Sequence, residues 1–225
     1  MNRSLFLGFI LLFSCSKTTK VSSIHINYEV KVQGKGDYVT PKNLIISACN
    51  EFVRMDLRTE EGLNIVTNRK ANDPKLFIYF QYQNVKAKIS DMDEWISVQS
   101  NFLKNETVIS EDVSINSKTY KAIRHSYSYK LDTVFEIIAL KNYEFTLPLL
   151  TNNFEQTKGI PVQVNCKFQN GVVFKASETS INGQLDLEDF ESYPSMTITE
   201  YMAKVSAINP SIKVDFTKLF YVFQP

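Results

Sequence analysis

The chain has 225 residues, a formal net charge of +1 and a hydrophobic fraction of 44%. Its size allows one large domain or two small ones, and its hydrophobic fraction excludes an intrinsically disordered chain. The near-neutral charge gives no electrostatic reason to expect nucleic acid as a partner. Aromatic residues are abundant, with 16 Phe and 11 Tyr, whereas Gly and Pro number only seven each, and this balance favours long strands.

The first residues have the layout of a secretory signal peptide. Arg3 precedes a short apolar run, and the chain turns abruptly polar after Cys15. The run spans only about half of a bilayer core, so we do not expect it to form a membrane-spanning helix. We predict a signal peptide over residues 1–14, a tether over residues 15–22 and a single β-rich domain over residues 23–225.

Alternation of apolar and polar side chains predicts strands along most of this domain. The clearest case is residues 24–32, where every second side chain from Ile24 to Val32 is apolar. Residues 75–82 are apolar on both faces, as expected for a strand that is covered on two sides. Further strands are predicted over residues 44–49, 52–58, 63–67, 85–89, 107–113, 120–129, 133–139, 162–168 and 172–179, with a last strand or packed tail over 216–223.

Two segments have helical rather than strand periodicity. Residues 93–103 place apolar side chains on one face, with acidic residues in the first turn. Residues 197–208 begin with a capping box, in which Glu200 follows Thr197 by three positions, and Pro210 stops the helix. We predict a helix over each segment.

The residues that could support catalysis are few. The two histidines, His25 and His125, have no zinc-site spacing, and no nucleophile elbow, phosphate-binding loop or dinucleotide motif is present. The sequence therefore predicts a protein that is not an enzyme and that needs no metal and no cofactor.

Two charged clusters have ordinary explanations. Arg54, Asp56 and Arg58 alternate on one strand face, where they are expected to form a solvent-side charge ladder, the alternative being the lining of a polar mouth. The acidic run over residues 186–191 lacks the spacing of a calcium loop and is expected to be a solvated loop.

Cys49 and Cys166 are the two cysteines that follow Cys15 in the chain. An exported protein is in a compartment that permits disulfides, so a disulfide between them is one interpretation. The other is that both are buried free thiols that behave as small apolar residues.

Many aromatic side chains fall within the predicted strands. If the sheet curls into a half-barrel, its concave face must be filled by the two helices or must leave a cavity for an apolar ligand. Both interpretations remain open at this point. The candidate lining residues are Tyr28, Phe77, Tyr79, Phe80, Tyr82, Tyr127, Tyr129 and Phe135.

The segment Leu12-Phe13-Ser14-Cys15 resembles the cleavage site of a bacterial lipoprotein signal. The resemblance implies that Cys15 is acylated through its sulfur and becomes the new N-terminus, anchoring the protein to a membrane. By analogy with the proteobacterial sorting rule, Ser16 after the cysteine implies transfer to the outer membrane. The next residues, Lys17-Thr18-Thr19, lack the acidic pair of Bacteroidetes surface-export signals, which implies the periplasmic face.

Residues 23–180 resemble the periplasmic lipoprotein carriers of the LolA/LolB type and related Bacteroidetes lipoproteins. The resemblance lies in Phe52-Val53-Arg54-Met55-Asp56, the turn at Gly62 and the strand Leu76-Phe77-Ile78-Tyr79. Members of that superfamily have an open, strongly curved antiparallel sheet with helices on its concave side, and known members bind acyl chains or other lipids there.

We therefore expect a mainly β (α+β) fold, with a single antiparallel half-barrel sheet of about ten strands and two helices packed on the concave side. The expected function is that of a non-enzymatic, outer-membrane-anchored periplasmic lipoprotein that binds a lipid or another apolar ligand. The alternative is a protein–protein interaction or assembly module of the cell envelope, with an envelope protein as its partner and no small-molecule ligand.

Overall fold

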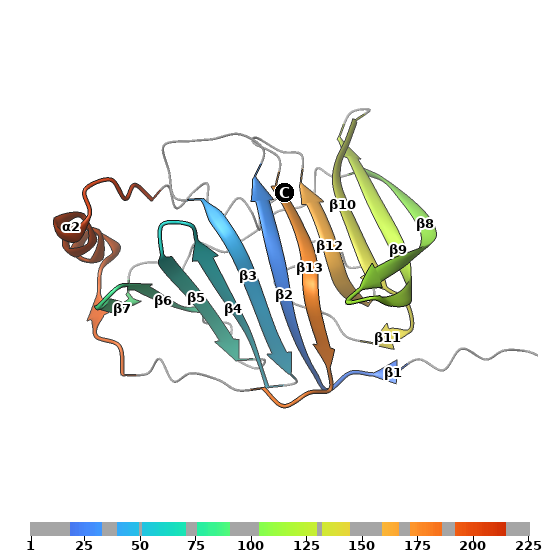
Figure 1. The fold of residues 1–225 in the computed structure, drawn as a ribbon, viewed down its shortest axis with the longest axis horizontal. Coiled ribbons are helices and arrows are strands. Elements are labelled where there is room, and N and C mark those ends of the chain that lie inside the picture. Colours follow the sequence, from blue (N-terminus) through green and yellow to red (C-terminus); the bar gives the residue numbers. More distant parts are fainter. Residues whose placement is uncertain are drawn as a thin grey trace, which may run out of the picture.

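The computed structural model describes residues 19–32, 40–49, 51–70, 76–90, 104–129, 132–144, 159–166, 172–185 and 192–214. These residues form one large open sheet, one two-stranded sheet and one helix (Figure 1). Several predictions concern segments outside the described residues. They are the signal peptide with Cys15, the helix over 93–103, the acidic run over 186–191 and the last strand or packed tail over 216–223.

The large sheet has twelve strands within the described ranges, in the order β14-β7-β6-β5-β4-β3-β2-β13-β12-β10-β9-β8. Their bounds are β2 Ser23–Val32, β3 Pro41–Cys49, β4 Phe52–Thr59, β5 Leu63–Lys70, β6 Leu76–Tyr82, β7 Val85–Ile89, β8 Lys104–Ile115, β9 Lys118–Tyr129, β10 Asp132–Leu140, β12 Ile160–Cys166, β13 Val172–Ile181 and β14 Ser195–Met196. The small sheet pairs β1 (Thr19–Lys20) with β11 (Tyr143–Glu144).

The mainly β class is confirmed, but two details of the prediction need correction. The strand count of about ten is too low. The sheet is also mixed rather than purely antiparallel, because the two-residue strand β14 pairs in parallel with β7. Short strands such as β14 and β1 bury too few side chains to produce a periodic pattern, so the sequence does not reveal them.

Two consecutive runs of antiparallel strands build the sheet. The first runs from β2 to β7 and the second from β8 to β13, and they join where β2 pairs with β13. Figure 1 shows the two strands, blue and orange, side by side at the centre of the sheet. Ile24 is opposite Ile181 at one end of this pair and Val32 is opposite Val172 at the other.

The predicted alternation of β2 and the two-sided burial of β6 are both confirmed. Ile24, Ile26 and Tyr28 are fully buried, whereas the side chains between them are not. In β6, Ile78 and Phe80 join the main core on one face of the sheet. Tyr79, also buried, belongs to a separate small cluster with Val66 and Tyr193 on the other face.

The second half of the sheet is strongly curled. Some Cα atoms of β8 and β13 lie within 8 Å of each other. Three strands separate β8 from β13 in the sheet order, so in a flat sheet they would be about 19 Å apart. The long hairpin of β8 and β9 turns at Asn116 and Ser117, whose φ angles of 48° and 63° fit a type I′ turn. Both strands are therefore longer than the predicted 107–113 and 120–129.

The described part of the chain contains one helix, α2 (Ile198–Ile208), which confirms the prediction over 197–208. Thr197 accepts a hydrogen bond from the Glu200 N–H at 3.2 Å, and the Thr197 N–H donates to the Glu200 carboxylate at 2.8 Å. The predicted capping box is therefore present. The helix lies beside the β7 end of the large sheet (Figure 1).

Candidate functional site

The candidate site is the apolar face of the sheet where helix α2 packs on β6 and β7. Tyr201 and Val205, one helical turn apart, are the buried residues of α2, and both are fully buried. The Tyr201 ring meets the Phe80 ring of β6 edge-on, with 5.3 Å between their centroids. The apolar side chains of β2 to β7 continue this face as one core.

The Tyr201 hydroxyl is the unusual feature of this site. Its oxygen is buried and has no hydrogen-bond partner among the described residues. Leaving a buried polar group unpaired costs about 1–3 kcal/mol, so such groups are uncommon in folded proteins. Burial raises the pKa of Tyr201 well above its usual value, and the nearby Tyr82 hydroxyl raises it further. The group therefore stays protonated at neutral pH and can donate a hydrogen bond.

Tyr82 supplies a second hydroxyl on the same side of the sheet. It accepts hydrogen bonds from the Asn209 side-chain amide at 3.3 Å and from the Gln83 side-chain amide at 3.4 Å. Because both of these groups donate to it, the hydrogen of the Tyr82 hydroxyl can be directed to a further acceptor. On β5, Thr67 adds a third buried hydroxyl of this face without a partner in the described ranges.

This arrangement suits the binding of an oxygen acceptor in apolar surroundings. The hydroxyls of Tyr201 and Tyr82 are donors, and Phe80 and Val205 belong to the same apolar core. Nucleophilic catalysis requires a base that hydrogen-bonds the attacking hydroxyl. Within the described residues, no histidine or carboxylate hydrogen-bonds the Tyr82 or Tyr201 hydroxyl, and no group of His, Cys, Asp and Glu side chains could hold a metal ion.

The structure brings only some of the predicted lining residues to this site. Phe80 and Tyr82 lie on the face that α2 covers. Phe77 and Tyr79 lie on the opposite face, because side chains alternate along β6. There Tyr79 packs edge-on against Tyr193 at 6.0 Å, and the Lys88 ammonium lies 4.3 Å from the centre of the Phe77 ring.

The other predicted lining residues lie away from α2. Tyr28 is fully buried, donates a 2.6 Å hydrogen bond to the Pro161 carbonyl and packs edge-on against Phe174. This hydrogen bond therefore links β2 to β12. Tyr127 is buried in β9, and the backbone at Tyr129 and Phe135 belongs to β9 and β10. The eight aromatic residues thus do not share one face.

Tyr201 and Asn209 are site residues that no sequence motif indicates. The helical period places Tyr201 on the buried face of α2, but nothing in the sequence states which strand that face meets. Asn209 directly follows the helix, and its N–H donates to the Val205 carbonyl at 2.8 Å. Its link to Tyr82 depends on tertiary packing and has no local sequence signal.

Cys49 is half-buried and carries a free thiol. Strand register explains why it has no disulfide with Cys166. Cys49 is opposite Ser23 at one end of β2, whereas Cys166 pairs with Val172, which is opposite Val32 at the other end. These ends of β2 are about 30 Å apart, far beyond the span of a disulfide.

The charge ladder on β4 differs from the prediction. Arg54 and Asp56 are buried, with 9% and 7% of their surface exposed, rather than solvated. One oxygen of Asp56 pairs with Arg58 at 3.4 Å. Of the two histidines, His25 hydrogen-bonds the Ser47 hydroxyl through Nδ1 at 2.9 Å, and His125 is buried within β9.

A network of ion pairs lies on the second half of the sheet, which comprises β8 to β13. Arg124 of β9 pairs with Glu111 at 3.0 Å and with Glu136 at 3.4 Å, and Glu136 also accepts hydrogen bonds from Asn165 and Ser126. Burial alone would raise the pKa of Glu136. The hydrogen bond from Asn165, the charge of Arg124 and the remaining donors outweigh burial and lower it. The network links β8, β9, β10 and β12.

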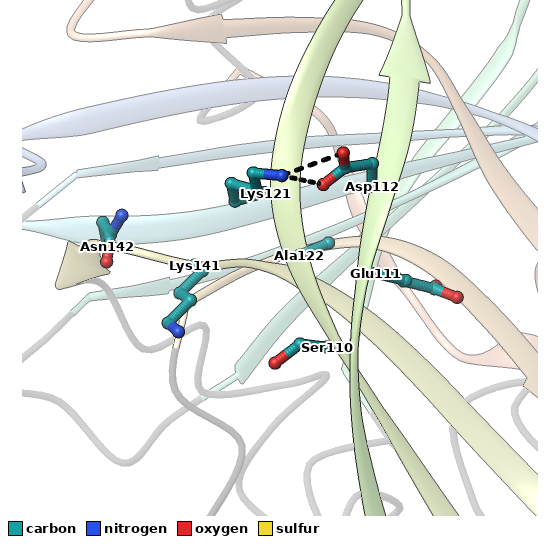
Figure 2. Close-up of a pocket in the computed structure, with 7 residues that line it drawn as sticks. All are labelled: Ser110, Glu111, Asp112, Lys121, Ala122, Lys141 and Asn142. Atoms are coloured by element: carbon teal, nitrogen blue, oxygen red, sulfur yellow. Dashed lines mark hydrogen bonds and ion pairs between the residues drawn. The ribbon is translucent and has the colours of Figure 1, made fainter.

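A shallow groove of about 600 Å³ lies at the end of β8, β9 and β10 (Figure 2). Its charged lining residues are Glu111, Asp112, Lys121 and Lys141. Figure 2 shows Lys121 paired with Asp112, and the shortest distance between their charged atoms is 2.8 Å. In the described ranges no carboxylate pairs with Lys141. With two acidic and two basic lining residues, the groove has no net charge.

Comparison with known proteins does not identify a relative. No protein-family model matches the chain, and no curated protein matches it. Within the described residues, no helix has the length and apolar character needed to cross a membrane.

Proposed function

We propose that this protein is a non-enzymatic, outer-membrane-anchored periplasmic lipoprotein that binds a lipid or another apolar ligand between its curved sheet and helix α2. The buried Tyr201 hydroxyl carries this proposal, because a donor without a partner inside an apolar face suits a ligand oxygen. Cys15 is the proposed site of the lipid anchor, and residues 1–14 are the proposed signal peptide.

The class of ligand follows from the chemistry of the site. The side chains around Tyr201 are apolar, so most of the ligand surface must be apolar as well. The hydroxyls of Tyr201 and Tyr82 would donate to one oxygen at its end, such as that of a carboxyl or an ester. A fatty acid or another acyl chain has both features.

Helix α2 is the proposed gate of the site. It buries Tyr201 and Val205 and packs the partly buried Ile198 and Met202 against the same core, and a movement of α2 away from the sheet would expose the Tyr201 hydroxyl. In this proposal the sheet is a half-barrel, α2 lies on its concave side, and a second helix over residues 93–103 covers another part of that side.

Binding of a fluorescent fatty acid tests the ligand proposal. The test protein is the chain from residue 15 onward with Cys15→Ser, which retains every described residue. Tyr201→Phe keeps the ring packing on Phe80 and removes only the hydroxyl, so we expect affinity to fall about two- to tenfold. The matched control is Tyr193→Phe, which removes a hydroxyl that donates to Gln81 on the opposite face.

Mass spectrometry of lipids extracted with the purified protein provides a second readout. Acyl lipids are expected with the starting protein, and less with Tyr201→Phe. If no lipid co-purifies and the fatty acid does not bind, the ligand proposal is wrong. Equal losses of affinity in Tyr201→Phe and Tyr193→Phe would show that the Tyr201 hydroxyl has no specific role.

Labelling with a radioactive fatty acid tests the anchor. The full chain is expected to incorporate the label and to fractionate with the outer membrane, and Cys15→Ser is expected to abolish both. Treatment of intact cells with protease tests the periplasmic orientation. Digestion of the protein in intact cells would place it on the cell surface instead.

A further inference from the structure

The chain is held on the domain from Thr19 onward. Strand β1, which begins at Thr19, pairs with β11. The N–H and the hydroxyl of Ser22 both donate to the Asn182 side-chain oxygen, at 2.8 and 3.0 Å. Only residues 16–18 therefore lie between the proposed lipid anchor at Cys15 and the first residue that the domain holds.

Such a short connection keeps one end of the sheet near the membrane. An extended chain covers at most about 3.6 Å per residue, so the Cα atoms of Cys15 and Thr19 can be at most about 14 Å apart. The two ends of β2 are roughly 30 Å apart. The end of the sheet where β2 begins is therefore within reach of the membrane surface. The opposite end reaches that surface only if the sheet lies flat on it.

Two turns lie at the end of the sheet where β2 begins. Strands β2, β13, β12, β10, β9 and β8 alternate in direction, so β12 and β9 begin at this end, and β10 and β8 finish there. The turn Asn116-Ser117 joins β8 to β9, and the turn Lys141-Asn142 joins β10 to β11. Figure 1 shows β1 and β11 beside each other below this half of the sheet.

The two turns are basic at their tips. Lys118 directly follows the first turn and Lys141 is part of the second, and both side chains are exposed. The two carboxylates of the groove in Figure 2, Glu111 and Asp112, pair with Arg124 and Lys121 instead. In the described ranges no carboxylate pairs with Lys118 or Lys141.

The first half of the sheet adds no net charge at the same end. Glu51, between β3 and β4, and Lys70, the last residue of β5, are both exposed there and have opposite charges. Lysines close to a membrane surface are attracted to anionic lipids, and salt screens this attraction beyond about 10 Å. The short tether and the lysines of the turns thus favour the same side of the domain for contact with lipid.

We propose that the turns Asn116-Ser117 and Lys141-Asn142 face the membrane that holds the anchor, with Lys118 and Lys141 against the phosphate groups of its lipids. This orientation rests on the proposed acylation of Cys15. The sheet then stands on this end. The turn after β4, which contains Glu60, lies at the opposite end, roughly 30 Å farther from the lipid.

Fluorescence quenching by lipid headgroups tests the orientation. The full acylated chain with Cys49→Ser and Cys166→Ser is inserted into vesicles of phosphatidylcholine and phosphatidylglycerol that carry a short-range quencher on some headgroups. A dye is attached to Ser117→Cys at the proposed membrane-facing turn, or to Glu60→Cys at the opposite end; both positions are exposed. We expect the first dye to be quenched at least about twice as strongly as the second, because the quencher acts only at short range and the ends are roughly 30 Å apart. Circular dichroism shows whether each variant is folded.

Removal of charge tests the two lysines. Phosphatidylglycerol should increase the quenching of the Ser117→Cys dye over that in phosphatidylcholine alone. Lys118→Gln together with Lys141→Gln is expected to remove at least about half of this increase. The matched control is Lys31→Gln together with Lys42→Gln, which changes two exposed lysines toward the other end of the sheet.

Equal quenching of the two dyes, or stronger quenching at Glu60→Cys, would overturn the proposed orientation. An increase with phosphatidylglycerol that Lys118→Gln and Lys141→Gln leave unchanged, or that the control variant reduces equally, would overturn the lysine contacts. Flotation of the protein with the vesicles reports the anchor separately. A protein that does not float would refute both the anchor and this orientation, whereas equal quenching on a protein that floats would refute the orientation alone.

Discussion

The side-chain amide of Asn209 donates a 3.3 Å hydrogen bond to the Tyr82 hydroxyl, across 127 positions of the chain. Asn209 directly follows helix α2 and Tyr82 ends strand β6, so this bond fixes the end of the helix to the sheet. A double-mutant cycle of Asn209→Ala and Tyr82→Phe measures its strength. We expect a coupling free energy of about 0.5–1.5 kcal/mol in urea unfolding. Additive single effects would mean that the bond contributes nothing to stability.

Removal of the Tyr201 hydroxyl is expected to stabilise the ligand-free protein. This oxygen is buried without a partner in the described ranges, so Tyr201→Phe should raise the free energy of unfolding by up to about 1 kcal/mol. Tyr193→Phe should lower it by about 0.5–1.5 kcal/mol, because Tyr193 loses a 3.1 Å bond to Gln81. Urea unfolding of delipidated protein measures both changes. Destabilisation by Tyr201→Phe would indicate that its hydroxyl has a partner.

Two glycines with positive φ are expected to respond differently to alanine. Gly159 has a φ of 110°, and a Cβ atom there would collide with the Leu140 carbonyl oxygen. Gly62 has a φ of 87° but has open space around the Cβ position. Gly62→Ala should therefore cost about 1 kcal/mol of backbone strain, whereas Gly159→Ala should cost about 2–4 kcal/mol. Thermal unfolding of the two variants checks the order, and equal losses would contradict it.

The Glu136 network is expected to lose its contribution in acid. Its folded-state pKa lies below its ordinary value, so the stabilisation is complete above about pH 4.5 and is lost as the pH falls through the lowered pKa. At pH 7, Glu136→Gln should destabilise the protein by about 1 kcal/mol, since Arg124 and Asn165 lose a charged acceptor. Urea unfolding at several pH values should show that this difference in stability shrinks as the pH falls below about 4.5. If the difference in unfolding free energy between the two proteins did not change with pH, titration of Glu136 would be excluded as its cause.

Much of the sheet could be predicted because burial on one face leaves a period of two in the sequence. The alternation from Ile24 to Val32 follows from this rule. The apolar run of β6 reflects burial on both faces of the sheet, and the capping box is a separate signal, the three-residue spacing of Thr197 and Glu200. The pairing of β2 with β13 and the contact of Tyr201 with Phe80 could not be predicted. Both join segments that are distant in sequence, and a local pattern carries no information about distant partners.

The burial of Arg54 and Asp56 shows another limit of pattern analysis. Their alternation with apolar residues correctly places them on the opposite face from Met55. Alternation does not reveal whether that face is open to solvent. The same is true of Phe77 and Tyr79, whose aromatic character suggested the lining of a cavity although they belong to the other face of the sheet.

The central pairing of β2 with β13 determines when the fold can be completed. The Ser22 N–H donates to the Asn182 side chain at 2.8 Å, across 160 positions of the chain. During synthesis, β2 emerges early, but β13, its neighbour on one side, emerges only after most of the chain has been made. Contacts this distant in sequence make folding slow and leave strand edges exposed in the meantime. We therefore expect the newly made chain to need a chaperone until β13 has been synthesised.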